Sequence, residues 1–369
     1  MADGPGQRRV IIAAGGTGGH MFPAAAFAQE MRARGWLVTL VTDVRGRRYS
    51  EGFPADAIED VPAATFQGRN PLHLAMAGLK IWRGIGAAGA RLRALTPKLV
   101  AGFGGYPSLP MLWAARARHI PILIHEQNAV LGRVNRHFAG QAAAIASGFE
   151  RLDRLPPAAA ARHHCVGNPV RAEIIAVRAG AYPQIPAGGE IVLLATGGSQ
   201  GARLFGQILP KAVIALDPKL RARLRIIQQV REEQMEAVRR VYHGAGVAAE
   251  VAPFFKDMAQ RLSQSHLVMA RAGASSVTEL LVVGRPAILI PLAIATDDHQ
   301  SANAEAMTQV GAADVIAESA LTTEGLSVLL AERLSDAHGL SVRAAAARAA
   351  GHPGAAGALA DLAERVARP

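Results

Sequence analysis

The sequence predicts an α/β fold of two doubly wound parallel-sheet domains, each with a glycine turn after its first strand. The first turn, residues 14–20 (AGGTGGH), lies between an apolar run at 10–13 and a helical pattern at 21–34. The second turn, 197–202 (GGSQGA), lies between the apolar run 191–195 and a helical pattern ending near 216. Four pairs of positions match at a constant offset of 182, namely Gly15/Gly197, Gly16/Gly198, Thr17/Ser199 and Gly19/Gly201. A strand, a glycine turn and a helix together form an anion site, because the first helical N–H groups and the helix dipole favour negative charge.

Length and composition agree with two domains in a reducing compartment. The chain has 369 residues, half of them hydrophobic, which suffices for two sizeable cores. Its single cysteine, Cys165, excludes an intramolecular disulfide and carries no metal-binding pattern, so we expect a cytoplasmic location. No apolar run approaches the ~20 residues of a membrane span, and residues 1–9 lack the apolar core of a signal peptide. We therefore expect a soluble or peripheral protein.

The charge is unevenly distributed. The formal net charge is +11, and residues 61–125 contain no Asp or Glu. The basic residues of this acid-free span are Arg69, Lys80, Arg83, Arg91, Arg93, Lys98, Arg116 and Arg118. Such asymmetry indicates an anionic partner, which could be nucleic acid, a membrane surface or a phosphorylated substrate. Aromatic residues make up only 5% of the chain, which argues against nucleic acid because few rings are present for base stacking. A basic surface that only aids solubility is the alternative.

Short apolar runs alternate with helical patterns along both halves. In the first half we expect strands at 36–41, 98–101, 120–124 and 142–146. In the second half we expect strands at 191–196, 224–228, 247–251, 266–270, 287–290 and 314–316. This alternation is typical of parallel sheets covered by helices on both faces, in which ligands bind beyond the carboxyl ends of the strands. Proline and glycine at 154–158 and 167–171 suit an interdomain connection, and 341–368 reads as helix with a break near 351–354.

Two motifs of the first half place polar side chains at strand ends. The turn at Gly15 is no dinucleotide fingerprint, because its third small position falls on Met21, and no Walker loop, because no Gly-Lys-Ser/Thr follows. His20 lies just beyond this turn, where an imidazole could contact substrate or act as a base, although many histidines at helix starts are structural. Residues 125–128 (HEQN) follow a buried strand, and four consecutive polar groups favour a ligand over strand-end capping alone.

Two motifs of the second half suit a nucleotide sugar. Residues 271–279 (RAGASSVTE) open a helix after the strand 266–270, and their free N–H groups suit a diphosphate. Glu279 could accept hydrogen bonds from two ribose hydroxyls, while helix capping by Ser275 or Ser276 with Glu279 is the alternative. Residues 297–303 (DDHQSAN) suit sugar hydroxyls but lack the ligand spacing of a metal site. We predict no obligatory metal and no cofactor.

An apolar stripe recurs at helical spacing within the acid-free span. It consists of Leu72, Met76, Leu79, Trp82 and Ile85, with Arg69, Lys80 and Arg83 beside it. Core packing is the usual interpretation of such a stripe, but basic plus apolar residues are also the composition of an interfacial helix. The residues alone leave both interpretations open.

Six motifs, in order across nearly the whole chain, resemble one family. They are residues 15–20 (GGTGGH), 102–107 (GFGGYP), 125–128 (HEQN), 167–171 (GNPVR), 197–201 (GGSQG) and 271–279. The chain in this respect resembles the MurG family of bacterial peptidoglycan N-acetylglucosaminyltransferases. The resemblance implies the GT-B glycosyltransferase fold, with an acceptor domain at 1–168 joined by the C-terminal helix at 341–369, a UDP-GlcNAc domain at 169–340, and the active site in the cleft between the domains.

The resemblance also implies a role for individual residues. The donor UDP-GlcNAc is expected to contact Thr17, Gly18, Gly19, Asn128, Arg171, Ser199, Phe255, Ala274, Ser275, Ser276, Val277, Thr278, Glu279 and Gln300. The acceptor diphosphate is expected at Gly15, Gly16, Gly104, Gly105 and Tyr106, and the membrane face at Leu72, Met76, Leu79, Lys80, Trp82 and Arg83. Phe255 would offer backbone contacts to uracil, where the family commonly has an aliphatic residue. The chain departs from the family at His299-Gln300, where two glutamines are common, and His299 receives no role.

The implied reaction is inverting transfer of GlcNAc to the C4 hydroxyl of lipid I, an undecaprenyl-diphosphate muramyl-pentapeptide, giving lipid II. A base must take the hydroxyl proton; His20 is the first candidate and Glu126 the second. The resemblance implies a peripheral location on the cytoplasmic face of the inner membrane, contact with anionic lipid, and proteins of cell-wall synthesis as candidate partners. The alternatives are a UDP-GlcNAc 2-epimerase or a lipid glycosyltransferase of the same fold, and a binding protein without catalysis.

Overall fold

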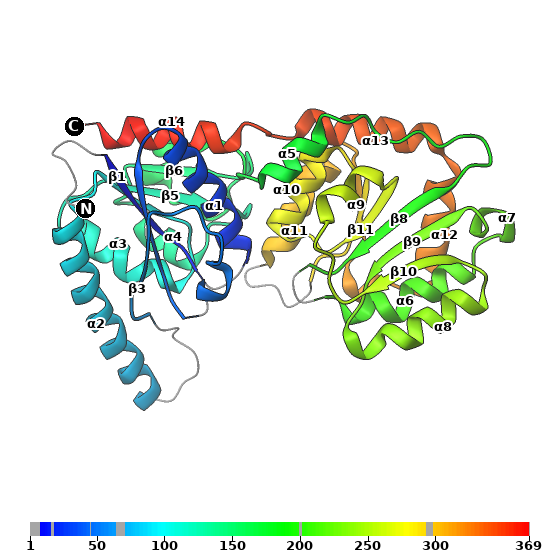
Figure 1. The fold of residues 1–369 in the computed structure, drawn as a ribbon, viewed down its shortest axis with the longest axis horizontal. Coiled ribbons are helices and arrows are strands. Elements are labelled where there is room, and N and C mark those ends of the chain that lie inside the picture. The colour runs from blue at the N-terminus through cyan, green and yellow to red at the C-terminus, as the bar shows by residue number, and fades with distance from the viewer. Residues whose placement is uncertain are drawn as a thin grey trace. The chain divides into compact units, whose positions relative to one another are not determined.

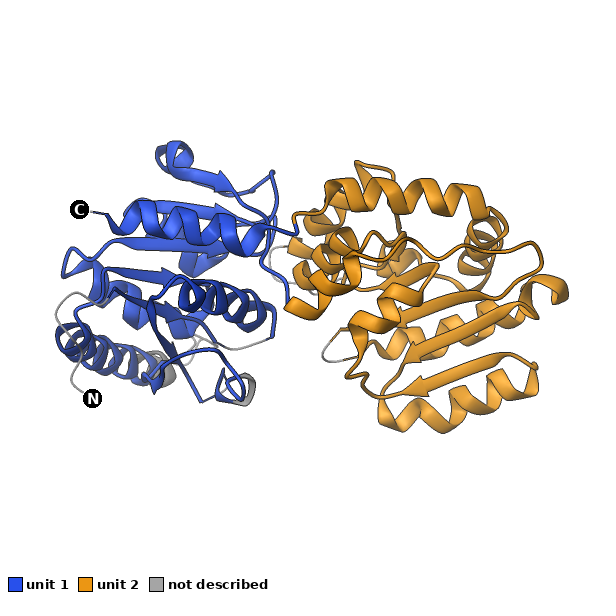
Figure 2. Ribbon diagram, turned by 45° about the horizontal axis from the view of Figure 1, so that its top comes forward, with its two compact units in different colours: residues 1–171, 353–369 blue, residues 172–352 orange. Residues whose placement is uncertain are grey.

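The chain forms two compact units (Figure 2). Unit 1 comprises Met1–Arg171 with Pro353–Pro369, and unit 2 comprises Ala172–His352. The structure, a computed structural model, describes residues 8–15, 18–44, 46–63, 71–198, 201–292 and 298–368, without the side chains of 48, 49 and 71–75.

The helical pattern predicted at 341–368 is two helices, one in each unit, with the break at Gly351–Gly354. A proline at position 353 is consistent with this break, because proline cannot continue a helix.

Unit 1 is built on one parallel sheet (Figure 1). Its strands are β1 (Arg9–Ala13), β2 (Leu37–Thr42), β3 (Ala57–Asp60), β4 (Leu99–Gly102), β5 (Ile122–Glu126), β6 (Ala144–Ser147) and β7 (His163–Cys165). Their spatial order is β3-β2-β1-β4-β5-β6-β7, and the described pairings are parallel. The order reverses between β1 and β4, which is where doubly wound sheets bind their ligands.

The side chains of alternate residues in β1 are buried on opposite faces of this sheet. The helices of unit 1 are α1 (Gly18–Ala33), α2 (Pro71–Leu95), α3 (Leu109–Arg116), α4 (Arg133–Phe138) and α14 (Ala355–Ala367). Val10 and Ile12 pack with α1 and α14 in one core, while Ile11 and Ala13 pack with α2, α3 and α4 in the other. This alternation follows from the two-residue period of a strand, and it explains why the strand reads as an unbroken apolar run.

Unit 2 repeats the design. Its strands are β8 (Ile191–Thr196), β9 (Leu224–Gln229), β10 (Ala248–Ala252), β11 (Leu267–Ala270), β12 (Ala287–Leu289) and β13 (Ala313–Val315), in the order β10-β9-β8-β11-β12-β13. Its helices are α5 (Ala172–Arg178), α6 (Arg203–Ile214), α7 (Pro218–Arg221), α8 (Met235–Gly244), α9 (Met258–Gln264), α10 (Ala274–Val283), α11 (His299–Thr308), α12 (Thr323–Ser335) and α13 (Ala337–Ala350). Helices α6, α8 and α12 share a core with Ile191, Leu193 and Ala195. The order again reverses beside the first strand, between β8 and β11.

The predicted fold class of two doubly wound parallel sheets is confirmed, and the predicted strands lie within one or two residues of the observed ones. Two strands were missed. β3 and β7 are edge strands of the first sheet, and their sequences, AIED and HHC, contain no apolar run. Edge strands lie partly in solvent, so they need little apolar character, and hydrophobicity alone does not reveal them.

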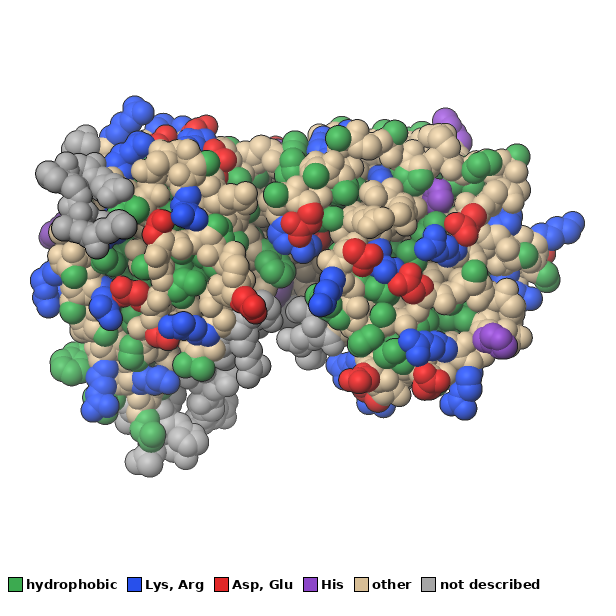
Figure 3. All heavy atoms as spheres, in the orientation of Figure 1, with side chains coloured by type: hydrophobic (Ala, Val, Ile, Leu, Met, Phe, Trp, Pro, Cys, Tyr) green, Lys and Arg blue, Asp and Glu red, His purple; other side chains and the backbone are tan. Residues whose placement is uncertain are grey.

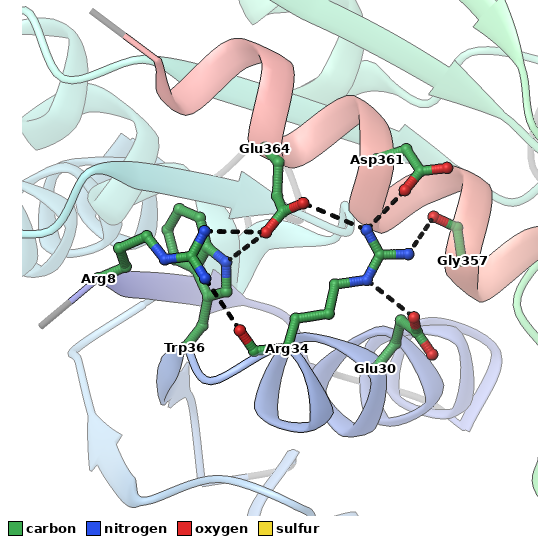
Figure 4. Close-up of polar contacts among 7 residues, drawn as sticks. All are labelled: Arg8, Glu30, Arg34, Trp36, Gly357, Asp361 and Glu364. Atoms are coloured by element: carbon green, nitrogen blue, oxygen red, sulfur yellow. Dashed lines mark hydrogen bonds and ion pairs between the residues drawn. The ribbon is translucent and has the colours of Figure 1, made fainter.

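Helix α14 is held on unit 1 by a polar clamp (Figure 4). Glu364 accepts hydrogen bonds from the Trp36 indole at 2.9 Å and from Arg8 at 3.1 Å. Arg34 donates to Asp361 at 2.6 Å, to Glu364 at 3.3 Å, to the Gly357 carbonyl at 3.1 Å and to Glu30 at 2.8 Å. The Trp36 hydrogen bond, with Arg34 and Arg8, lowers the pKa of the Glu364 carboxyl below its ordinary value. The clamp thereby joins the first and last parts of unit 1.

We expect Glu364→Ala to destabilise unit 1 by about 1–2 kcal/mol, because Trp36 is almost fully buried and would lose its only described acceptor. Thermal unfolding of the full chain measures this. The difference from wild type should be present near neutral pH and should shrink in acid as pH falls through the lowered pKa of Glu364, since the folded state then loses the charged carboxylate. Glu332→Ala is the control, because Glu332 pairs with Arg333 on an exposed surface. Equal losses in both variants would contradict the clamp's contribution.

Candidate functional site

Close packing surrounds Gly15, the first glycine of the turn in unit 1. A Cβ on Gly15 would lie 2.8 Å from Thr42 Oγ1 and 2.9 Å from Pro107 Cγ, so only glycine fits without displacement. A Cβ on Gly105 would lie 3.2 Å from the Gly15 carbonyl oxygen, which shows that the loops after β1 and β4 lie side by side. Gly104 and Gly105 have φ of 84° and 75°, a region that favours glycine. The predicted sites at these positions are thus brought together at the reversal point of the sheet.

His20 lies over this pair of glycines. The Cβ that Gly104 lacks would lie 3.3 Å from His20 Cδ2 and 3.5 Å from its Nε2, and that of Gly105 would lie 3.9 Å from Cε1. His20 is in the first turn of α1, where the helix start brings its partly exposed imidazole to the carboxyl end of the sheet. A Cβ at Gly104 would therefore crowd the imidazole, whereas a Cβ at Gly105 would lie at ordinary contact distance from it.

Glu126 is buried and accepts four hydrogen bonds. Oε1 accepts from the Asn128 backbone N–H at 3.1 Å and its side-chain amide at 3.2 Å, and Oε2 accepts from Gly132 N–H at 2.9 Å and Asn135 Nδ2 at 2.8 Å. Burial raises the pKa of this carboxyl, although all four donors oppose the rise. Because both oxygens are engaged, Glu126 organises the loop from 126 to 135.

His125 is a buried neutral imidazole. Its ring packs against that of Phe103 with centroids 5.0 Å apart. Burial lowers the pKa of His125 to about 4; the nearby Gly167 backbone opposes this shift and His20 adds to it. A charged His125 would be costly here, so this histidine is held uncharged at neutral pH.

Two further predicted positions of unit 1 lie near its boundary and its β4 loop. The Arg171 guanidinium lies over the Phe22 ring, with Cζ 5.1 Å from the ring centroid. Tyr106 is partly buried against the core under α2 and α3. Asn168, from the motif at 167–171, donates to the Gln127 carbonyl at 2.8 Å and so joins that motif to the loop after β5.

The glycine turn of unit 2 has a polar support that the sequence did not reveal. A Cβ on Gly197 would lie 2.0 Å from the Ala202 backbone nitrogen, so the turn requires glycine there. Gln229 accepts from the Thr196 hydroxyl at 2.7 Å and donates to the Gly198 and Pro253 carbonyls, each at 3.1 Å. It therefore ties the loops after β8 and β10 together. The available signal was a pair of glutamines, 228 and 229, at the end of an apolar strand.

Helix α10 begins without a side-chain cap. Its N-cap is Gly273, with no capping hydrogen bond from a side chain, so neither Ser275 nor Ser276 is the N-cap of this helix. Ser275 Oγ is buried and makes no hydrogen bond to the described residues. Ala274, Ser275, Ser276, Val277, Thr278 and Glu279 form the first turns of this helix. The helix start thus offers backbone N–H groups to an anion, and the same turn holds the enclosed Ser275 hydroxyl.

Phe255 and Gln300, two predicted donor-binding residues, have different surroundings. Phe255 is 5% exposed and the Arg261 guanidinium lies over its ring, 4.0 Å from the centroid, so its side chain is structural. Gln300, in the first turn of α11, accepts from Leu292 N–H at 2.9 Å through Oε1, which directs its amide NH₂ away from that bond. His299 precedes it in the same turn.

Helix α2 presents an apolar and basic surface. Met76 is 63% exposed, Leu79 51% and Trp82 72%, and Lys80 and Arg83 are exposed beside them. Figure 3 shows hydrophobic and basic side chains mixed on the surface over α2, at the lower left. Ile85, part of the predicted stripe, instead packs partly against the core. Within the described residues, no helix has both the length and the apolar character needed to cross a membrane.

Several predicted positions lie outside the described residues. These are Gly16, Thr17, Arg69, Ser199 and Asp297, together with the side chain of Leu72. Gly18 and Gly19 are described, and they begin α1. Among the described residues there is no group of three or more His, Cys, Asp or Glu side chains that could hold a metal ion.

Two domain matches define the class of protein. Residues 10–147 match the glycosyltransferase family 28 N-terminal domain, and residues 192–365 match the glycosyltransferase family 28 C-terminal domain. The chain belongs to glycosyltransferase family 28, and its fold is the GT-B fold.

Individual relatives are similar over nearly their whole length. The chain is 51% identical to the UDP-N-acetylglucosamine–N-acetylmuramyl-(pentapeptide) pyrophosphoryl-undecaprenol N-acetylglucosamine transferase of Maricaulis maris, over 96% of each chain. It is 48% identical to the transferase of the same name from Chelativorans, over 98% of this chain and 96% of the relative. The crystal structure of Acinetobacter baumannii MurG is 31% identical, with a TM-score of 0.80 over 97% of this chain and 99% of that one. The predicted family resemblance is confirmed.

His125 should make folding pH-dependent. Its pKa of about 4 lies below the ordinary value of 6.5, so the unfolded chain binds a proton more readily than the folded one. The stability that neutral His125 contributes should be complete above about pH 6.5 and should be lost as pH falls towards 4. We expect the gap in unfolding free energy between wild type and His125→Gln to narrow over that range. His338→Gln is the control, because His338 is exposed on α13; a gap that stays constant for His125→Gln would contradict the assignment.

Proposed function

We propose that this chain transfers GlcNAc from UDP-GlcNAc to the muramyl-pentapeptide of undecaprenyl-diphosphate-linked lipid I, giving lipid II for peptidoglycan. The observation that carries this proposal is 51% identity over 96% of each chain to a transferase named for that donor and acceptor. The two glycine turns support it, because each unit places one at the reversal point of its sheet.

We assign the donor to unit 2. The start of α10 and Ser199 would hold the diphosphate, Glu279 the ribose, and the Phe255 backbone the uracil, while Gln300 would donate its amide to a sugar hydroxyl. Three features support this assignment: the uncapped α10 N-terminus, the unpartnered Ser275 hydroxyl and the Gln229 support beneath the turn. In unit 1 we assign Thr17, Gly18, Gly19 and Asn128 to the transferred sugar and Arg171 to a diphosphate. Helix N-termini and an arginine would stabilise the charge of departing UDP electrostatically.

We assign the acceptor to unit 1, with His20 as the general base. The acceptor diphosphate would lie at Gly15, Gly16, Gly104, Gly105 and Tyr106. In the reaction the C4 hydroxyl attacks the anomeric carbon, the bond to UDP breaks on the opposite face, and the hydroxyl proton passes to the imidazole. The geometry favours His20 over Glu126, because His20 is partly exposed beside the paired glycines whereas both Glu126 oxygens already accept hydrogen bonds inside the protein.

The proposed transfer can be measured directly with labelled UDP-GlcNAc and a short-chain lipid I analogue in the presence of EDTA. We expect the disaccharide product to form, since helix N-termini and Arg171 supply the positive charge. His20→Ala should lower kcat about 100- to 10,000-fold, because the base is lost. His338→Ala, on the exposed surface of α13, is the control.

Two results would contradict parts of this proposal. An unchanged kcat for His20→Ala would mean that another group is the base. Binding or epimerisation of UDP-GlcNAc without transfer would support the donor assignment and reject the acceptor, and would favour a 2-epimerase of the same fold.

We further propose that α2 docks on an anionic membrane surface. Exposed Met76, Leu79 and Trp82 would enter the interface, with Lys80 and Arg83 at the lipid phosphates. This places the enzyme beside its lipid-linked acceptor, as a peripheral protein at the inner membrane.

Flotation with vesicles of anionic phospholipid tests this docking. Leu79→Glu and Trp82→Glu should each weaken binding about tenfold or more, because each removes a large apolar group and adds a repelled charge. Val328→Glu is the matched control, since Val328 is 69% exposed but lies on α12 of unit 2. Flotation unchanged by the α2 variants, or equally reduced by Val328→Glu, would reject the membrane face.

A further inference from the structure

Phe22 is a partly exposed aromatic residue in the second turn of α1. Its side chain is 37% exposed, although most large apolar side chains of α1 are buried in the core. The ring extends back toward the start of the helix: a Cβ on Gly18 would lie 3.0 Å from Phe22 Cε2 and 3.3 Å from Cζ. This is the normal direction of a helical side chain, which covers the turn before its own Cα. Glycine at position 18 therefore gives the Phe22 ring its place over the helix start.

The guanidinium of Arg171 lies over this same ring. Its Cζ is 5.1 Å from the ring centroid, within the range of a cation–π interaction. Arg171 ends the first segment of unit 1 and lies far from α1 in the sequence, so the stack joins two distant segments. A guanidinium can stack through its flat face while its N–H groups, which lie in the plane, still donate at the edge.

We propose that Phe22 is a positioning residue that holds the Arg171 guanidinium at the start of α1, so that the cation and the helix N-terminus act on one diphosphate. This inference rests on the proposed function, because the diphosphate is that of a substrate of GlcNAc transfer. Both groups carry positive charge, and a fixed cation needs no reorganisation when charge develops on a phosphate. The diphosphate could belong to UDP or to the lipid acceptor, and the two arms of the test below separate these sources.

The alternative is an exposed phenylalanine without a role. Single exposed apolar residues are common on protein surfaces. The two interpretations differ in one measurable respect. If Phe22 acts only through Arg171, the ring has no effect once the guanidinium is gone, whereas a general structural effect persists in either background.

A double-mutant cycle tests the proposal. The variants are Phe22→Leu, Arg171→Met and the two combined, with Phe22→Tyr as the conservative variant that keeps the ring. We expect Phe22→Leu to lower kcat/KM for transfer about threefold to thirtyfold, which matches the usual strength of a cation–π contact. Phe22→Tyr should restore most of the activity, and Phe22→Leu should have no further effect in the Arg171→Met background. Arg116→Met is the matched control: Arg116 stacks on Trp113 at the same 5.1 Å, but at the last turn of α3.

Two readouts identify the diphosphate. Weaker binding of UDP to Phe22→Leu, measured by calorimetry, assigns the pair to the donor, and a raised KM for the lipid analogue with unchanged UDP binding assigns it to the acceptor. Equal losses from Phe22→Leu with and without Arg171, or a Phe22→Tyr as impaired as Phe22→Leu, would overturn the inference. Melting temperatures verify folding, and Phe22→Met replaces Phe22→Leu in the cycle if that variant unfolds. If wild type binds UDP but transfers no GlcNAc, the proposed function fails, and the same cycle in UDP binding still decides whether Phe22 acts through Arg171.

Discussion

The constraint on which both units depend is close packing around the glycine that follows the first strand of each sheet. Gly15 lies against Thr42 and Pro107, and Gly197 lies against the Ala202 nitrogen, at separations that no side chain could share. Doubly wound sheets bring two loops together at this point, and a ligand can reach the helix start only if the loops stay small. The absence of a Cβ at these glycines therefore allows the close packing, and it also fits the ligand sites proposed at these turns.

Buried polar side chains at strand ends hold one loop of each unit in place. In unit 1, Glu126 collects four N–H groups from residues 128 to 135, and in unit 2, Gln229 joins Thr196, Gly198 and Pro253. Gln229 orders the glycine turn of unit 2, which gains little from hydrophobic burial, whereas the loop that Glu126 orders also buries Leu131. The two units reach this result with different residues, a carboxylate in one and an amide in the other. The repeated fold thus does not require a repeated set of supports.

Much of this architecture could be predicted from the sequence, because parallel strands buried on both faces read as apolar runs and glycine turns have a clear signature. The order of the strands in each sheet could not be predicted. The edge strands β3 and β7 could not be predicted either, since their sequences carry no pattern of burial. The residue types of the site were apparent at His20, Glu126 and the start of α10. The sequence did not show which of these side chains are partly exposed and which are hydrogen-bonded inside the protein. Glu126 is unavailable as a base only because Gly132 and Asn135 donate to it in the folded chain. Gln229 was missed for the same reason.

The return of α14 to unit 1 has a consequence for synthesis on the ribosome. Leu359, Ala360, Leu362 and Ala363 fill part of the core beside β1, yet they are translated after all of unit 2. The sheet of unit 1 therefore keeps one face incompletely covered while the next 180 or so residues are made, as the unit bounds require. Unit 2 has no such dependence, because its residues are contiguous. Unit 1 is therefore the first to be synthesised and the last that can complete its folding. During that interval a chaperone could bind its uncovered apolar face.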